Sequence, residues 1–362
     1  MAAPRKVTAA PRRLPFERLP VRRIILIALS LAIIYGVVSG SAATLRTGVF
    51  DGAAWRALVI NGLARGSVYA LIAIGYTLVY GVLFMINFAH GEVFTSGTYT
   101  AFFVAVGLAN SGFLNTHPLL SITLLVIVSM TVSMIVAIVL ERIAYRPLRG
   151  APRLVPLITA IGASLFLQYT MRGFFGANVR SYPEIDIIQG KWAILGIEIL
   201  RKQAIVIIAA LVLWIILYFV VAKTRTGRSM RAVGEDREIA ALMGIDVDRT
   251  IVATFAIGGA LAGAAGILYV FVFNQVIFMM GFIPGLKAFT AAVLGGIGSI
   301  TGAAVGGLIL GILEAVGPNL FLTGANVPSP NQLQPVVAFG ILVLVLIFLP
   351  GGFFGAAGDE RA

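Results

Sequence analysis

The sequence predicts an all-α protein, a polytopic transmembrane helix bundle of about eight to ten membrane segments. Of its 362 residues, 59% are hydrophobic and only 12% are charged. A soluble domain carries roughly 25% charged residues, so about half of the usual polar surface is absent here. Mean hydropathy is +0.99, and apolar runs of about 20 residues recur along the chain. Lipid is therefore the expected solvent for most of the sequence.

Several function classes are excluded by residue type. The chain has no cysteine, which rules out disulfides, thiolate metal sites and cysteine nucleophiles. His90 and His117 are its only histidines, too few for a zinc or di-metal hydrolase. Phosphate-loop, HExxH and GxSxG motifs are absent. We expect no metal, no cofactor and no enzyme activity, and in particular no ATP hydrolysis by this chain.

The first segment, residues 1–23, holds seven basic residues, four prolines and one acid. It cannot bury apolar surface and is predicted to be a disordered cytoplasmic tail. The following run, 24–43, is long enough to cross about 30 Å of hydrocarbon. A basic start and the small residues Ser41-Ala42-Ala43 also resemble a signal peptide. The length of the run and the spans after it favour a retained helix.

Further apolar runs predict the remaining spans, within a single transmembrane domain at 24–352 that is followed by a short tail at 353–362. They are 58–79, 93–109, 119–140, 154–175, 203–222, 251–273, a glycine-rich region at 286–316, and 333–349.

The loops orient these spans. Loops 141–153 and 223–249 are rich in arginine, whereas 176–202 carries three acids and no marked basic excess. Two spans separate the basic loops, so both are predicted on the side of the basic tail, the cytoplasm. The net charge of +12 is thus explained by topology and does not require nucleic acid as a partner.

The glycine-rich region has two interpretations. The spacings Gly298–Gly302–Gly306 and Gly307–Gly311 are typical of close helix packing through small residues. Alternatively, a re-entrant or broken helix near 287–300 places unwound backbone along a cavity. An odd number of spans leaves the carboxyl terminus outside, and a re-entrant element restores an even number.

Ionisable and polar residues beside the spans are candidates for a transport pathway or its gate. A charge at mid-bilayer costs about 2.5–3.5 kcal/mol, so such residues usually face protein or water. Asn87, His90 and Glu92 form either an interfacial turn and helix start, with Glu92 at the positive helix end, or a polar turn that shapes the pathway. Lys287 either reaches an interface or pairs with a partner, as does Glu314 near a helix end. The candidates are Tyr69, Asn87, His90, Glu92, Lys287 and Glu314.

The cytoplasmic loop 223–249 contains a short amphipathic helix at 237–243. Ile239, Ala240, Leu242 and Met243 give it an apolar side, and Gly244 ends it as a C-cap. A solvated loop that only sets topology explains the arginines but not this apolar side. We therefore expect a docking helix for a cytoplasmic partner.

Six ordered blocks between about Asn61 and Gly352 resemble one family, the H-type permease subunits of branched-chain amino acid ABC importers (the Liv system). The blocks are 66–71, 85–92 (Met-Ile-Asn-Phe-Ala-His-Gly-Glu), 145–149, 160–162, 227–246 and 287–299.

The resemblance implies four partners: a second related permease, two cytoplasmic ATPase subunits and an extracytoplasmic binding protein that delivers Leu, Ile or Val. It also implies a multi-pass protein of the bacterial inner membrane. Importer permeases carry an E-A-A-x-x-x-G coupling motif, which Glu238, Ala240 and Gly244 match, with Ile239 in place of the first Ala.

Two alternatives stay open at the level of sequence. Urea and short-chain amide permeases share much of the pattern, so the substrate is less fixed than the mechanism. An ion-coupled secondary transporter, from another class, would need no docking helix and would place carboxylates within spans. The basic tail and the span at 24–43 are additions to the family pattern, which leaves the helix count open.

Overall fold

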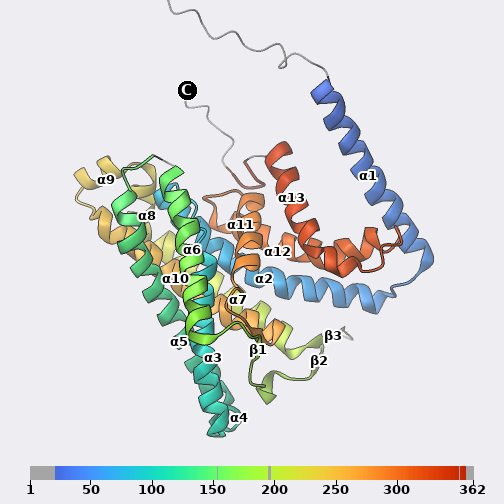
Figure 1. Cartoon of the computed structure of the whole chain (residues 1–362), viewed down its shortest axis with the longest axis horizontal. Coiled ribbons are helices and arrows are strands. Elements are labelled where there is room, and N and C mark those ends of the chain that lie inside the picture. Colours follow the sequence, from blue (N-terminus) through green and yellow to red (C-terminus); the bar gives the residue numbers. More distant parts are fainter. Residues whose placement is uncertain (1–20, 153, 195–196, 350, 356–362) are drawn as a thin grey trace, which may run out of the picture.

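The computed structural model describes residues 21–152, 154–194, 197–349 and 351–355 (Figure 1). Most of the predicted basic tail and of the carboxyl-terminal tail lie outside the described residues. Within them the chain folds into a bundle of long helices. The α-helices are α1 (Val21–Thr47), α2 (Gly52–Leu83), α3 (His90–Asn110), α4 (Phe113–Thr116), α5 (Pro118–Leu140), α6 (Leu154–Phe175), α7 (Arg201–Lys223), α8 (Arg225–Glu235), α9 (Arg237–Leu242), α10 (Val247–Phe273), α11 (Phe282–Gly295), α12 (Ile300–Gly317) and α13 (Gln334–Phe348).

Eight helical segments among the described residues are long and apolar enough to cross a bilayer. They are 52–83, 90–110, 118–148, 154–175, 201–223, 247–273, 300–322 and 330–348. The polytopic helical bundle predicted from the sequence is confirmed. Several helices are longer than the spans predicted from the sequence. The helical conformation continues beyond each apolar run into the polar or charged residues at its ends.

Short irregular elements and strands complete the fold. They are the π-helical turns η2 (Glu141–Tyr145) and η5 (Pro318–Leu322), the 3₁₀ turns η3 (Arg146–Leu148), η4 (Asp186–Ile188) and η6 (Pro330–Leu333), and the strands β1 (Arg180–Ser181), β2 (Lys191–Ile194), β3 (Ile197–Leu200) and β4 (Gln275–Val276). β1 pairs antiparallel with β4, and β2 with β3. These two small sheets were not predicted.

The most extensive helix–helix contact joins α2 and α12, and it runs through glycines. A Cβ atom added at Gly66 would lie 2.8 Å from the carbonyl oxygen of Gly307, and one at Gly62 would lie 2.8 Å from Ile312 Cα. The two backbones therefore touch where any side chain would separate them, as small-residue interfaces allow. The predicted packing role is confirmed for Gly302, Gly306, Gly307 and Gly311, which touch the backbone of α11 or α2, but not for Gly298, where an added Cβ atom would meet nothing within 4 Å.

The glycine-rich region is also broken. α11 ends at Gly295 and α12 begins at Ile300, with positive φ angles of 100° at Gly296 and 102° at Gly298. Only glycine adopts such angles readily, so the helix stops here. The amides of Phe353 and Phe354 donate to the carbonyls of Leu294 and Gly295, which stabilises the freed end of α11. The predicted break is therefore found beside the predicted close packing, and the placement of unwound backbone along a cavity stays a prediction.

The two ends of the bundle differ in character (Figure 1). α8 and α9 lie at one end, and α4 and the strands lie at the opposite end. Arg149, from the first basic loop, contacts Asp248, near the end of the second, so both basic loops share an end as predicted. Segment 176–202, with β1 to β3, lies at the other end.

α1 stands at the edge of the molecule and covers the predicted span 24–43 (Figure 1). Its carboxyl-terminal half packs against the segment that follows α12, where Gly40 and Thr44 contact the backbone around Phe321 and Gly324. Retention of this helix in the mature protein stays a prediction.

Candidate functional site

Three of the predicted pathway residues meet in the interior, although they come from three helices. Lys287 of α11 donates from Nζ to Oε1 of Glu314 of α12 at 2.7 Å, and the Tyr69 hydroxyl of α2 lies 3.4 Å from the same oxygen. The Lys287 ammonium also lies 5.7 Å from the centroid of the Tyr69 ring. Lys287 is 7% exposed and Glu314 1%, so the prediction that Lys287 reaches an interface is wrong. A buried lysine remains charged most readily beside a buried carboxylate, and Glu314 supplies one.

The other three predicted residues surround the start of α3. Asn87 accepts a hydrogen bond from the Tyr145 hydroxyl at 2.6 Å. His90 packs against Gly75 of α2, where a Cβ atom would collide with its ring, and lies 4.9 Å from the Tyr76 ring centroid. Glycine at position 75 thus makes room for the imidazole.

Glu92 stands in the first turn of α3, where a carboxylate interacts favourably with the helix dipole. Its Oε1 accepts a hydrogen bond from Gln168 Nε2 of α6 at 3.1 Å. Its Oε2 has no hydrogen-bond partner among the described residues, although the side chain is only 1% exposed. The predicted helix start is confirmed, and Asn87, His90 and Glu92 are all buried within the protein; whether this turn lies at the membrane interface stays a prediction.

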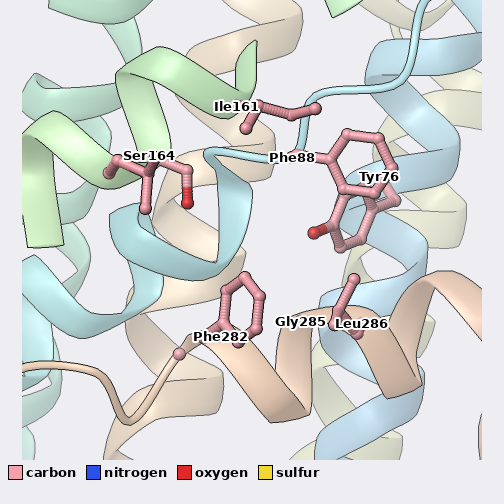
Figure 2. A pocket seen from close by; sticks show the side chains of 9 residues that line it. Tyr76, Phe88, Ile161, Ser164, Phe282, Gly285 and Leu286 are labelled. Carbon is pink, nitrogen blue, oxygen red and sulfur yellow. The ribbon is translucent and has the colours of Figure 1, made fainter. Parts of the chain in front are cut away.

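A cavity of about 220 Å³ opens beside this second group (Figure 2). The hydroxyls of Tyr76 and Ser164 point toward its centre, as does the Phe282 ring. Its remaining walls are Phe88, Ile161, Leu165, Gly281, Gly285 and Leu286. The cavity is thus mostly apolar with a small polar side, as is typical of small-molecule sites.

Sequence reasoning missed Tyr76, Ser164 and Gln168. A signal existed for the last two, because they stand four residues apart in the apolar span 154–175 and so share one helix face. A polar pair on one face of a span indicates a face turned toward protein rather than lipid.

The predicted docking helix corresponds to α9. Asp236 caps it, accepting from the amides of Glu238 at 2.8 Å and Ile239 at 2.9 Å. The chain leaves the helix through Gly244, whose φ of +83° is the expected left-handed C-cap conformation. Glu238 and Gly244 are exposed, whereas Ala240 is buried beneath the helix.

Three large apolar side chains project from this region into solvent. The exposed fractions are 59% for Ile239, 87% for Leu242 and 78% for Met243. An apolar surface of this kind on a polar loop marks an interaction site. Within the described residues no group of three or more His, Asp or Glu could hold a metal ion.

A model of the family described as "branched-chain amino acid transport system / permease component" matches residues 58–346. The chain is 42% identical over 310 residues to the high-affinity branched-chain amino acid transport system permease protein BraD of Pseudomonas aeruginosa, covering 84% of this chain and 96% of that protein. It is 40% identical over 312 residues to LivH of Escherichia coli, with the same coverage of each chain.

A more distant relative is the probable branched-chain amino acid transport permease protein LivH of Methanocaldococcus jannaschii. It is 28% identical over 305 residues, which cover 82% of this chain and 92% of that protein. No solved structure matches. The family model covers α2 to α13 almost completely, and the relatives are matched over nearly their whole length. The chain is therefore a multi-pass membrane protein that belongs to the permease-component family of branched-chain amino acid transport systems.

Proposed function

We propose that this chain is the permease subunit of an ATP-driven importer that carries leucine, isoleucine and valine. It works with a second related permease, two cytoplasmic ATPase subunits that hydrolyse ATP, and an extracytoplasmic binding protein that delivers the amino acid. The basic tail and α9 lie on the cytoplasmic side of a bacterial inner membrane. The names of the relatives support the substrate class, and the exposed apolar surface of α9 carries the assignment of an ATPase partner.

The position of α9 suits the transmission of force. Arg237, its first residue, donates from Nη2 to the carbonyl of Val82, near the end of α2, at 3.1 Å. Arg231 of α8 donates to the carbonyl of Val221 at the end of α7. A displacement of α9 is therefore transmitted to α2, the helix that carries both Tyr69 and Tyr76. Glu238, Ala240 and Gly244 act here by shaping the helix that the ATPase holds.

The two interior groups have different roles in this proposal. The polar residues at the start of α3, namely Asn87, His90 and Glu92, border the pathway. Tyr69, Lys287 and Glu314 form its gate, because their contacts join α2, α11 and α12 and must change when these helices separate.

Gly244→Arg and Glu238→Lys test the coupling role. Arginine at φ +83° is strained, and the reversed charge faces the ATPase, so both variants are expected to lose leucine uptake and ATPase co-purification while inserting normally. Glu184→Lys is the matched control: the same charge change at an exposed site on the opposite end of the bundle, which retains ATPase co-purification. Full uptake by either coupling variant, or uptake by the chain without an ATPase, contradicts the proposal.

The substrate is tested by competition. Unlabelled isoleucine and valine are expected to displace labelled leucine from uptake by the assembled importer, and urea is not. Competition by urea alone would assign the chain to amide transport instead.

A further inference from the structure

The cavity shown in Figure 2 lies well inside the membrane domain. Tyr76 precedes the end of α2 at Leu83 by seven residues, and Ile161 follows the start of α6 at Leu154 by seven. At about 1.5 Å per residue both lie roughly 10 Å from those helix ends. Leu83 and Leu154 lie together with Arg237 at the end that carries α9. The cavity therefore lies about 10 Å from the helix ends on this side of the bundle, within the part of the chain that spans the membrane.

The carboxylate of Glu92 lies behind the polar side of the cavity, formed by the Tyr76 and Ser164 hydroxyls. Gln168 binds one oxygen of Glu92, and the other oxygen, fully enclosed, has no hydrogen-bond partner among the described residues. Glu92 lies close enough to Ser164 and Tyr76 to interact with each, and both of those hydroxyls face the cavity. The Ser164 hydroxyl is thus a nearby donor that could satisfy this oxygen, and a cationic group at the polar side of the cavity would add a counter-charge to the buried carboxylate.

A second helix supplies a positive end at the same place. α11 begins at Gly281 and Phe282, which line the cavity, and no side chain caps this N-terminus. The backbones of Gly281 and Gly91 are in contact, so the N-termini of α3 and α11 meet beside the cavity. The Phe282 amide already donates to the Met279 carbonyl, and Pro284 has no amide hydrogen, so the start of α11 favours an anionic group through its helix dipole rather than through free N–H groups.

The apolar walls complete the pattern. Ile161, Leu165 and Phe282 line a small, half-open space that suits a branched aliphatic group rather than a drug-sized ligand. Ile161 and Leu165 are also partly open at the surface of the chain. The mouth of the cavity therefore faces outward, where a second chain or the pathway could reach it.

We propose that this cavity is a subsite for a small zwitterionic amino acid within the membrane domain. The ammonium group lies against the Tyr76 and Ser164 hydroxyls with Glu92 as its counter-charge, the carboxylate faces the start of α11, and the aliphatic side chain contacts Ile161, Leu165 and Phe282. This inference rests on the proposed function and specifies where the permease itself holds its substrate. A lipid chain would use only the apolar walls, and the test separates the two occupants.

The experiment measures leucine binding by calorimetry to the assembled importer in nanodiscs, without the binding protein. The wild type is expected to bind leucine saturably. Ile161→Trp fills the cavity and weakens this binding at least tenfold. Ile158→Trp is the matched control, three residues earlier on α6 and outside the cavity, and leaves binding within twofold.

Two analogues identify the charge that Glu92 recognises. Leucinol keeps the ammonium group and lacks the carboxylate, whereas isocaproate keeps the carboxylate and lacks the ammonium group. Glu92→Gln is expected to weaken leucine and leucinol at least tenfold and to leave isocaproate binding unchanged or tighter. A merely structural role of Glu92 would weaken all three ligands alike.

Three results overturn the subsite: no saturable leucine binding by the wild type, equal effects of the two tryptophan variants, or a Glu92→Gln variant that loses all three ligands. ATP-driven uptake with the binding protein is measured in parallel. Leucine uptake without leucine binding overturns the subsite alone, whereas transport of urea in place of leucine overturns the proposed function.

Discussion

The buried pair Lys287–Glu314 provides the sharpest test of how the interior is held together. At 2.7 Å between Nζ and Oε1, an effective dielectric constant of about 20 gives an attraction of about 6 kcal/mol. Removing two charges from water costs several kcal/mol per ion, so the net contribution of the intact pair is small. Losing one partner, however, leaves the other charge buried and uncompensated.

Lys287→Met is therefore expected to destabilise the protein by about 3–5 kcal/mol, and Glu314→Met by a similar amount. The double variant should return to within about 1 kcal/mol of the wild type, because two apolar side chains replace both charges. Tyr69→Phe removes only a 3.4 Å contact and should cost about 0.5–1.5 kcal/mol.

The assay is thermal unfolding of the purified protein in lipid nanodiscs. With an unfolding entropy of about 2.1 cal/mol/K per residue, a chain of 362 residues shifts its melting temperature by about 1.3 °C per kcal/mol, so each single variant should melt about 4–7 °C below the wild type. A double variant that is as unstable as the worse single variant refutes this reasoning, since the loss would then reflect packing rather than unpaired charge.

Three further predictions concern the frame around the site. Gly66→Ala should destabilise by about 1–3 kcal/mol and lower the yield of monodisperse protein, because its new Cβ would collide with the backbone of α12. Glu141→Gln should lower the melting temperature far more than Asp248→Asn, because Glu141 is fully buried against Arg149 whereas Asp248 is largely exposed; about 3–5 against at most 1 kcal/mol are expected. The hydrogen bond and charge of Lys191 lower the pKa of the exposed Glu198, so their ion pair is present at neutral pH and is lost as the pH falls below 4.5, the ordinary pKa of a glutamate. Carboxyl NMR titration should show that the pKa of Glu198 rises in Lys191→Ala.

Controls make these tests specific. Gly107→Ala places a Cβ in open space on α3 and should leave the yield unchanged. An equal loss for Gly66→Ala and Gly107→Ala would contradict the packing argument. Equal melting temperatures for the two carboxylate variants would contradict the burial argument, and an unchanged titration of Glu198 would show that Lys191 does not set its pKa.

Local residue pattern and the choice of solvent were enough to predict the spans, the grouping of the basic loops and the short helix between them. Apolar runs predict the spans because each must cover the hydrocarbon thickness. Arginine-rich loops predict that 141–153 and 223–249 share an end, and the fold has them there. The helix predicted to dock a partner also follows from local sequence. Its apolar side and Gly244 as its C-cap predict the bounds of α9 to within a residue.

Only the tertiary structure decided which polar residues meet. Tyr69 and Glu314 are 245 positions apart, and no periodicity connects them. Glu92 and Gln168, 76 positions apart, become partners because α3 and α6 pack side by side. Lys287 was predicted either to reach an interface or to pair with a partner that the sequence did not name, and the return of α12 after the break at Gly296 brings Glu314 to it. Composition and pattern fix what each segment can do in lipid, whereas the partner of a buried charge depends on the packing of the whole bundle.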